Sequence, residues 1–348
     1  MLKTISYIAG GFVAVGILLI ALLWALSVGT VHFSFSQIFE IVISQWDNPL
    51  AYDDPMNSAE QTIIWMLRFP RLLMAIIVGA GLAIAGVVMQ AIVKNPLADP
   101  YILGISSGAS LGATIAILFN IGIVLGDNFV GIMAFLGAIA ISFAVLCISN
   151  LGRRSNSIKL ILAGLALSAV CTSFSSFIVY MVNDKEGIQT ITYWLMGSLG
   201  GAKWDMIPFI GGAVLVSILF FWLQSRVLNL MLLGDEVAIT LGCDLHLYRQ
   251  AYLIVSSLIV GFVVYAAGMI GFIGLLIPHV VRMVVGTNHW VLIPFSALSG
   301  SIFLVIADGL CRSIIPHVEL PIGILISIVG APTFVYMLVR KNYGFGGN

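Results

Sequence analysis

Charged side chains are scarce in this sequence. Only 9% of its 348 residues are charged, whereas 60% are hydrophobic, and a soluble domain usually carries roughly 25% charged residues. The chain therefore cannot present an ordinary water-facing surface. Backbone groups in lipid must be hydrogen-bonded internally, and the apolar runs are too long and continuous for barrel strands. We expect an all-α integral membrane protein.

Several motifs for chemistry are absent as well. No GxxxxGK[ST] loop occurs, and even the dipeptide Gly-Lys is missing, so an ATP-driven function would need another subunit to bind ATP. There is no HExxH motif, and the four scattered cysteines form no CxxC pair, which argues against a disulfide or metal site. Lys plus Arg and Asp plus Glu balance at 15 each, which gives no reason to expect nucleic acid as a partner. We expect no bound metal or cofactor.

Long apolar runs recur along the chain and predict one transmembrane domain over residues 1–348. The first run is about 22 residues long, which exceeds a signal-peptide core and suits a retained membrane helix. An outer loop is predicted at about 30–67 and a cytoplasmic loop at about 225–249. The ten predicted spans are 5–26, 70–92, 101–119, 129–150, 159–182, 206–224, 250–268, 275–287, 291–311 and 322–339.

The distribution of Lys and Arg over the short loops predicts that both termini are cytoplasmic. Basic residues gather in cytoplasmic loops of membrane proteins. With the N-terminus inside, ten basic residues fall on the cytoplasmic side and five on the outer side. The outer five are Arg68, Arg71, Lys185, Lys203 and Arg312.

Glycine spacing predicts close helix contacts and one broken helix. Gly104, Gly108 and Gly112 are spaced by four residues, so they form a ridge that another backbone can approach closely. Gly268, Gly271 and Gly274, followed by Pro278, interrupt a span instead. Non-helical backbone at membrane depth is tolerated only where protein or a water-filled cavity covers it, so this region is a candidate part of a pathway.

Two short motifs are weak signals of chemistry. Residues 104–108 match GxSxG, but that hydrolase motif needs a strand-turn-helix context and a His-acid pair, and here it opens an apolar helix. An intramembrane hydrolase is therefore disfavoured. His279 has no partner at ligand spacing, so we expect it to cap the broken helix rather than to bind a metal.

The predicted cytoplasmic loop contains a short amphipathic segment, Leu233–Gly242. Asp235 and Glu236 fall in the first turn of a helix, where negative charge is favourable. The apolar residues Leu233, Val237 and Leu241 then share one face. Two interpretations remain open: this face packs on the membrane domain, or it docks in a groove of a partner protein.

Three arginines lie on the side where topology disfavours positive charge. Arg68 and Arg71 precede the second span, and Arg312 follows the ninth. They could be interfacial arginines whose side chains reach toward the membrane surface. They could equally clamp carboxylates of an extracytoplasmic partner, because arginine forms bidentate, charge-assisted pairs.

The fifth span is unusually rich in hydroxyl groups. Such groups favour either helix packing or the lining of a polar path. The residues are Ser168, Thr172, Ser173, Ser175 and Ser176.

Seven segments, occurring in family order, resemble the FecCD family of ABC importer permeases, whose best-known relative imports cobalamin. The resemblance covers roughly residues 60–340 and leaves 30–60 unmatched. The matching segments are Arg68-Phe-Pro-Arg71 with 79–86, Met89-Gln90 with Asn95–Pro100, Leu103–Ala109, Leu233–Gly242, Gly271–His279, Ala307-Asp308, and Leu320–Gly323 with Gly330–Pro332.

This resemblance implies a type II ABC importer permease that is not itself an enzyme. The family consists of multi-pass bacterial inner-membrane subunits of about ten helices, paired with a second copy or a paralogue around a path at their interface. Two cytoplasmic ATPases use the ATP, and an extracytoplasmic binding protein delivers the substrate. The implied substrate is siderophore-bound iron, haem or cobalamin. An ion-coupled secondary transporter is the alternative, although acidic residues at mid-span are nearly absent.

The resemblance also implies roles for the residues singled out above. Arg68, Arg71 and Arg312 match arginines that pair with acidic residues of the binding protein, and the fifth span lies beside the cavity. The implied coupling segment, which sits in the ATPase groove, comprises Leu233, Gly234, Asp235, Glu236, Val237, Ala238, Leu241 and Gly242.

Overall fold

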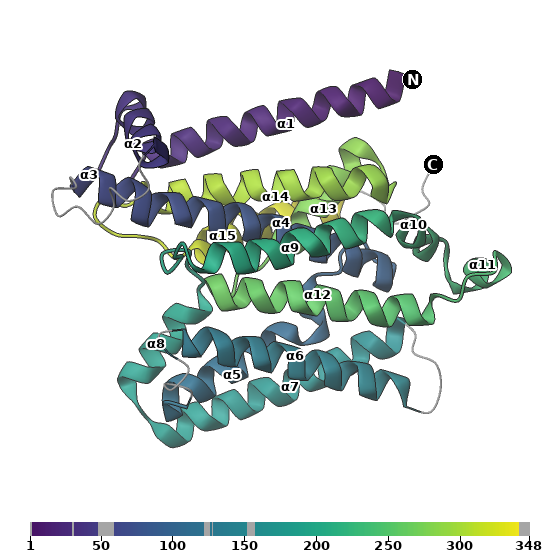
Figure 1. Cartoon of the computed structure of the whole chain (residues 1–348). Helices are drawn as coiled ribbons and strands as arrows, with labels where there is room; N and C mark the ends of the chain where they lie inside the picture. Colours follow the sequence, from purple (N-terminus) through teal and green to yellow (C-terminus); the bar gives the residue numbers. More distant parts are fainter. Residues whose placement is uncertain are drawn as a thin grey trace.

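The computed structural model describes residues 2–29, 31–47, 59–121, 126, 128–151 and 157–340. These ranges contain helices and their connections and no strand. The long helices lie side by side in one bundle (Figure 1). The all-α expectation is confirmed, and its cause is the internal hydrogen bonding that lipid demands.

Each of the ten predicted spans coincides with a helix. Within the described residues, seven helical segments are long and apolar enough to cross a bilayer, whereas the apolar stretches of α5, α13 and α15 (Ile322–Tyr336 in the last) have fewer than 18 residues. The number of crossings and the orientation therefore stay predictions. The helices are α1 (Leu2–Ser27), α4 (Phe69–Val93), α5 (Ile105–Phe119), α6 (Phe129–Asn150), α7 (Ser157–Val182), α9 (Met206–Leu223), α12 (Leu245–Ala267), α13 (Ile273–Val285), α14 (His289–Cys311) and α15 (Ile322–Arg340).

Part of the segment predicted as an outer loop, 30–67, is helical. It contains α2 (Phe35–Asp47), α3 (Ala59–Thr62) and the π-helix η2 (Ile63–Arg68), which runs directly into α4. Pro70 lies in the first turn of α4, and proline lacks an N–H and crowds the carbonyl four residues earlier. The wider π-turn that precedes it accommodates this proline. Residues 30 and 48–58 of the predicted loop lie outside the described ranges.

Four shorter elements complete the chain. The predicted cytoplasmic loop, 225–249, is mostly helical, because it holds α10, α11 and the first turn of α12. The short elements are η3 (Pro100–Leu103), α8 (Lys185–Leu195), α10 (Ser225–Leu233) and α11 (Asp235–Thr240).

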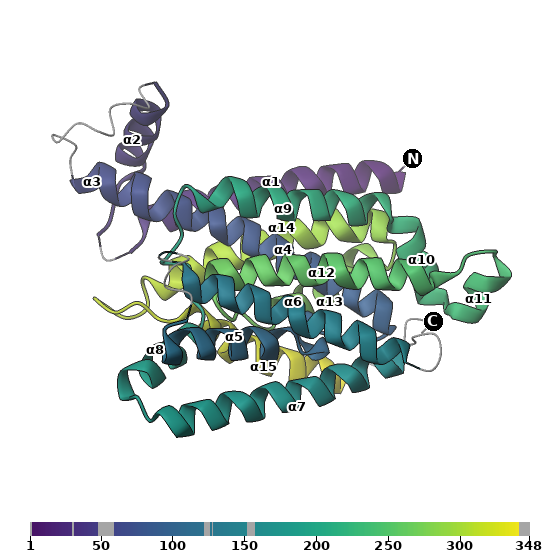
Figure 2. The ribbon, with the colours of Figure 1, turned by 60° about the horizontal axis from the view of Figure 1, so that its bottom comes forward.

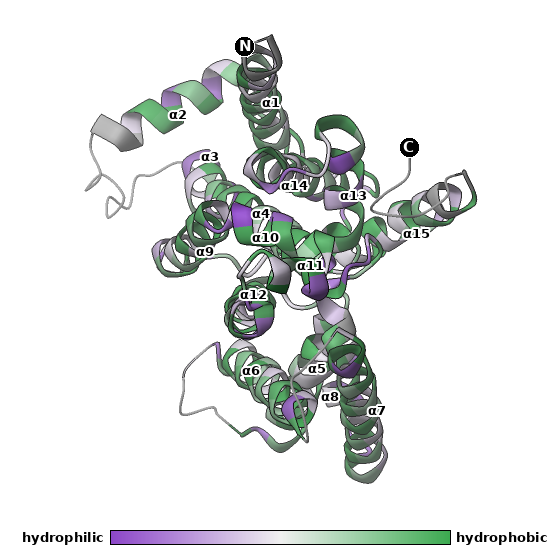
Figure 3. Cartoon of the chain, turned by 90° about the vertical axis from the view of Figure 1, so that its right-hand side faces the viewer, coloured by the Kyte–Doolittle hydropathy of each residue, from purple (hydrophilic) through white to green (hydrophobic). Residues whose placement is uncertain are grey.

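Helix α4 lies at the centre of the bundle, and α1, α7 and α15 lie at its edge when viewed from the α10–α11 end (Figure 3). In an 18-residue apolar window of the span that contains α4, 83% of the residues are buried by protein, against 11% in the corresponding window of α1 and 17% in that of α7. Glycines allow this enclosure. Gly79 meets the backbone of Gly300 in α14, and Gly86 meets the backbone of Gly274 in α13.

The predicted glycine ridge is confirmed for two of its three members. A Cβ on Gly108 or Gly112 would overlap backbone atoms of α6, at Gly137 and Met133 respectively. Gly104 serves another purpose: it precedes α5 with a left-handed φ of 80° and lies beside α7. Only glycine adopts that conformation without strain.

The predicted break between 268 and 274 is confirmed. α12 ends at Ala267, Gly268 has φ 67°, and α13 begins at Ile273 after Phe272, which has φ 64°. The prediction that His279 caps this helix is wrong, because His279 is buried well inside α13. Within the described ranges, no group of three or more His, Cys, Asp or Glu side chains could hold a metal ion.

Tryptophans lie at both ends of α9. At one end Trp204 packs on Trp65, with ring centroids 5.0 Å apart, and its indole N–H donates to the Trp65 carbonyl. At the other end Trp222 stacks on Trp290, with centroids 4.4 Å apart. Tryptophan prefers membrane interfaces. The 18 residues of α9 span about 27 Å at 1.5 Å per residue, close to the hydrocarbon thickness of a bilayer.

The two ends of the bundle differ in character. We call the end that carries Arg68, Arg71 and Arg312 the arginine end; α10 and α11 lie at the opposite end (Figure 2). α1 begins and α15 ends at the α10–α11 end. This placement agrees with termini on one side of the membrane and with the assignment of the arginine end to the outside.

Cysteine labelling of intact cells tests that orientation. With the exposed Cys147 replaced by serine, a cysteine at Asn183, beside α8, is expected to react with an impermeant maleimide. A cysteine at Glu236, in α11, is expected to react only after lysis. Both positions are exposed in the structure, so a difference in labelling would reflect the side of the membrane and not burial within the protein. Labelling of the cysteine at position 236 from outside would show that the α10–α11 end faces outward, contrary to the predicted orientation.

Candidate functional site

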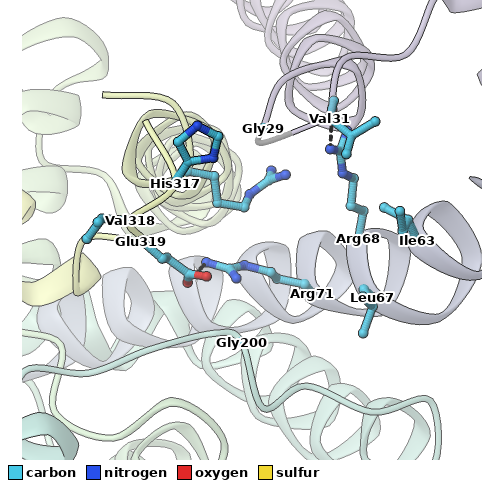
Figure 4. A pocket seen from close by; sticks show the side chains of 11 residues that line it. Gly29, Val31, Ile63, Leu67, Arg68, Arg71, Gly200, His317, Val318 and Glu319 are labelled. Carbon is cyan, nitrogen blue, oxygen red and sulfur yellow. Dashed lines mark hydrogen bonds and ion pairs between the residues drawn. The ribbon is translucent and has the colours of Figure 1, made fainter. Parts of the chain in front are cut away.

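Three arginines that are far apart in sequence meet in one pocket at the arginine end. Arg68 ends η2, Arg71 lies in the first turn of α4, and Arg312 follows α14. The pocket has a volume of about 460 Å³, and Glu319, from the connection between α14 and α15, also lines it (Figure 4). The three arginines singled out in the sequence therefore lie together, and Glu319, which no sequence pattern indicated, lies with them.

A buried carboxylate, Asp308, joins two of the arginines. Arg71 Nε donates to one oxygen of Asp308 at 2.6 Å, and Arg312 Nε donates to the other at 3.0 Å. Asp308 is fully buried and Arg71 is 8% exposed. A buried arginine needs such a partner, since an unpaired charge in low dielectric is costly. The outward terminal nitrogen Nη2 of Arg71 binds Glu319.

The remaining donors of Arg68 and Arg312 cap the C-terminus of α1. Arg68 donates to the carbonyls of Leu26 and Val31, and Arg312 donates to those of Ala25 and Val28. The last carbonyls of a helix have no intrahelical partner, and positive charge is favourable there. Both arginines therefore hold α1 against α4 and α14. Sequence spacing could not reveal this role, because backbone acceptors leave no residue signature.

The predicted coupling segment forms two helices separated by Gly234. Ala238 is buried against the body of the protein. Leu233, Val237 and Leu241 are 43% to 65% exposed, and so is the neighbouring Ile239, which the sequence pattern did not flag. The apolar face thus points away from the membrane domain in this chain, which favours docking over internal packing.

The two acidic residues of α11 have different environments. Asp235 pairs with Arg249 at 2.7 Å and with Lys94 at 3.5 Å, so it fixes α11 to α12 and to the end of α4. Glu236 is exposed. Glycine at 234 has φ 103°, and Gly242 has φ 80°, so both turns that bound α11 require left-handed backbone.

The hydroxyl-rich face of α7 divides into two parts. Thr172, Ser173 and Ser176 are exposed, whereas Ser168 and Ser175 are partly buried. Thr114, Ser142 and Ser217, in other helices, each donate to the carbonyl four residues earlier. Within the described residues none of the five α7 hydroxyls makes such a bond, and the buried oxygen of Ser175 has no hydrogen-bond partner. The hydroxyls of Thr172, Ser173 and Ser176 are therefore accessible from outside the chain, whereas the Ser175 oxygen is buried.

The chain is thus a bundle of long apolar helices with a polar pocket at one end and an exposed apolar helix at the other, consistent with a multi-pass membrane protein. The model of the FecCD transport family matches residues 17–340. The chain therefore belongs to this family, and it is an ABC importer permease.

Similar proteins support this assignment. The chain is 39% identical to the hemin transport system permease protein HmuU of Yersinia pestis, over 80% of this chain and 84% of that protein. It is 36% identical to the vitamin B12 import system permease protein BtuC of Salmonella arizonae, over 85% and 88%. A solved structure described as an inward-facing conformation of a metal-chelate type ABC transporter aligns with a TM-score of 0.81 and 30% identity, over 95% of this chain and 99% of that one.

Proposed function

We propose that this permease imports an iron complex, with siderophore-bound iron as the preferred substrate and haem or cobalamin as the other candidates. The similar proteins that transport hemin and vitamin B12 support this substrate class, because both ligands are large metal chelates. The observation that carries the ATP-driven mechanism is the exposed apolar face of α11.

The α10–α11 end is the proposed docking site for a cytoplasmic ATPase, which hydrolyses ATP in place of this chain. Four apolar side chains on a helix of six residues and its flanks suit insertion into a groove. The ion pairs of Asp235 keep α11 at a fixed position, so force applied to α11 reaches α4 and α12. Two ATPase copies would serve a permease pair.

The arginine end is the proposed docking site for a substrate-binding protein that presents carboxylates. Arg71 and Arg312 share one buried carboxylate, so the pocket keeps positive charge that suits an acidic partner. The exposed hydroxyl face of α7 suits contact with a second permease, with the path between the two copies. We place the assembly in the bacterial inner membrane, surrounded by lipid.

A secondary transporter driven by ions would use ionisable residues inside the bundle. Asp308 is such a residue, but it already has two arginine partners and lies at the arginine end. The geometry therefore favours the ATP-driven importer.

Replacing Leu241 with lysine tests the ATPase docking site. The permease and its ATPase are co-expressed, and their copurification and the ATP-dependent uptake of the iron complex into proteoliposomes are measured. Both are expected to fall at least about tenfold, because a buried charge at a docked interface costs more than 1.4 kcal/mol.

The matched control is Ile314→Lys at the opposite end, where the apolar side chain is 50% exposed, against 65% for Leu241. It is expected to leave copurification unchanged. If Leu241→Lys assembled with its ATPase and supported uptake normally, the assignment of α11 to the docking site would be wrong. Uptake that continues without ATP would overturn the ATP-driven function itself.

A further inference from the structure

The two carboxylates that bind Arg71 are held very differently. Asp308 is fully buried, lies in α14 and is also bound by Arg312. The side chain of Glu319 is 45% exposed, and among the described residues Arg71 is its partner. Asp308 is therefore a fixed counter-ion, whereas Glu319 is partly hydrated and can exchange its place on Arg71 with another carboxylate.

Glu319 also lies next to two other parts of the molecule, the start of α15 and the connection between α8 and α9. It belongs to the connection between α14 and α15, three residues before α15 begins. The first residues of α15 donate backbone hydrogen bonds to the connection between α8 and α9: Ile322 N–H to Gly197 and Gly323 N–H to Met196. Gly200, from that same connection, lies beside Arg71 and Glu319.

Figure 4 shows the side chains of Arg71 and Glu319 directed toward one another across the pocket, with His317 and Val318 next to Glu319. An incoming carboxylate that reaches Arg71 must take the position that Glu319 occupies. In this exchange the charge-assisted bond between Arg71 Nη2 and Glu319 is replaced by one between Arg71 Nη2 and the incoming carboxylate. No hydrogen bond of Arg71 is lost in the process.

We propose that Glu319 is an internal competitor for the carboxylate of the docking partner. In the free permease it occupies the outward donor of Arg71, and an acidic side chain of the partner displaces it during docking. Release of Glu319 removes one of the contacts that hold the connection leading into α15, so the displacement changes the environment at the start of that helix. This inference rests on the proposed docking of an acidic partner at the arginine end.

The competition can be measured with a defined probe, the peptide hexaglutamate, on the full-length permease in nanodiscs. Glu319→Gln keeps the shape of the side chain and weakens its hold on Arg71, and Glu319→Ala removes the competitor. Both variants are expected to bind hexaglutamate about two- to fivefold more tightly than the unchanged protein, which is the range for an exposed ion pair. Glu186→Gln, an exposed acid in α8, is the matched control and is expected to change nothing.

A spin label reports the displacement itself. Cys147 and Cys243 are replaced by serine, and a label is attached to a cysteine at His317, which is exposed on the same connection. Hexaglutamate is expected to increase the mobility of this label when Glu319 is present. In Glu319→Gln the label is expected to be more mobile already and to change little, a response that a purely structural Glu319 would not give.

The outcomes separate the two proposals. Equal hexaglutamate affinity in all variants, with no change at the label, would overturn the competitor role while leaving acidic docking intact. Weaker binding in Glu319→Gln would also overturn it, since Glu319 would then help the ligand to bind. No hexaglutamate binding to any variant, with hexalysine as the charge control, would overturn both the competitor role and the acidic docking site.

Discussion

Replacing Gly86 with alanine is expected to prevent the permease from folding into a stable bundle. The added Cβ would overlap the carbonyl and Cα of Gly274, which belong to the backbone of α13. A side chain could rotate away from such a clash, but the main chain of a packed helix cannot. We expect a loss of at least about 3 kcal/mol, the upper part of the range for overpacking.

Gly212 provides the matched control for this substitution. It lies in α9, and a Cβ there meets no atom within 4 Å. Alanine is a better helix former than glycine by about 1 kcal/mol, so Gly212→Ala should be neutral or slightly stabilising. Yield of monodisperse protein and thermal unfolding in detergent measure both variants. A Gly86→Ala protein as stable as the control would show that α4 and α13 do not pack as described.

Replacing Asp308 with alanine is expected to have the second largest effect. It would leave Arg71 and Arg312 without their shared buried carboxylate. Removing one partner of a buried ion pair typically costs about 3–5 kcal/mol, because the remaining charge is uncompensated. Since Arg312 also caps α1, the loss should reach the packing of α1 on α14.

Glu319→Gln serves as the comparison for Asp308→Ala. Both variants remove a carboxylate from Arg71, but the Glu319 side chain is 45% exposed whereas Asp308 is fully buried, so a cost below about 1 kcal/mol is expected there. Thermal unfolding and protease sensitivity of the α1–α2 connection measure the difference. If both variants unfolded at the same temperature, burial of Asp308 would not control the stability of this cluster.

The helices of this protein could be predicted from the sequence because each depends on a continuous run of neighbouring apolar residues. A run of about 20 apolar residues has only one way to satisfy its backbone in lipid. The ridge at Gly108 and Gly112 followed from helical periodicity in the same way. The helical character of 59–68 could not be predicted, since it depends on a π-turn that accommodates the proline at 70.

The hydrogen-bond partners of the arginines could not be predicted from the sequence, because they lie far away along the chain. Arg71 binds carboxylates 237 and 248 positions later in the chain. Arg312 binds carbonyls 284 and 287 positions earlier. No periodicity connects such distant residues. The orientation of the apolar face of α11 was equally undetermined, because the pattern defines a face but not the direction in which it points.

The central position of α4 has a consequence for how the protein is made. Ribosomes add about 5–20 residues per second, so roughly 10–50 s separate the synthesis of Arg71 from that of Asp308, 237 residues later. During that interval α4 lacks its counter-ion and α14, the helix with which it makes its most extensive contact, while the other helices that cover it emerge one after another. A nascent chain halted before α14 should therefore need an insertase or membrane chaperone to protect α4, and the emergence of Asp308 should mark its release.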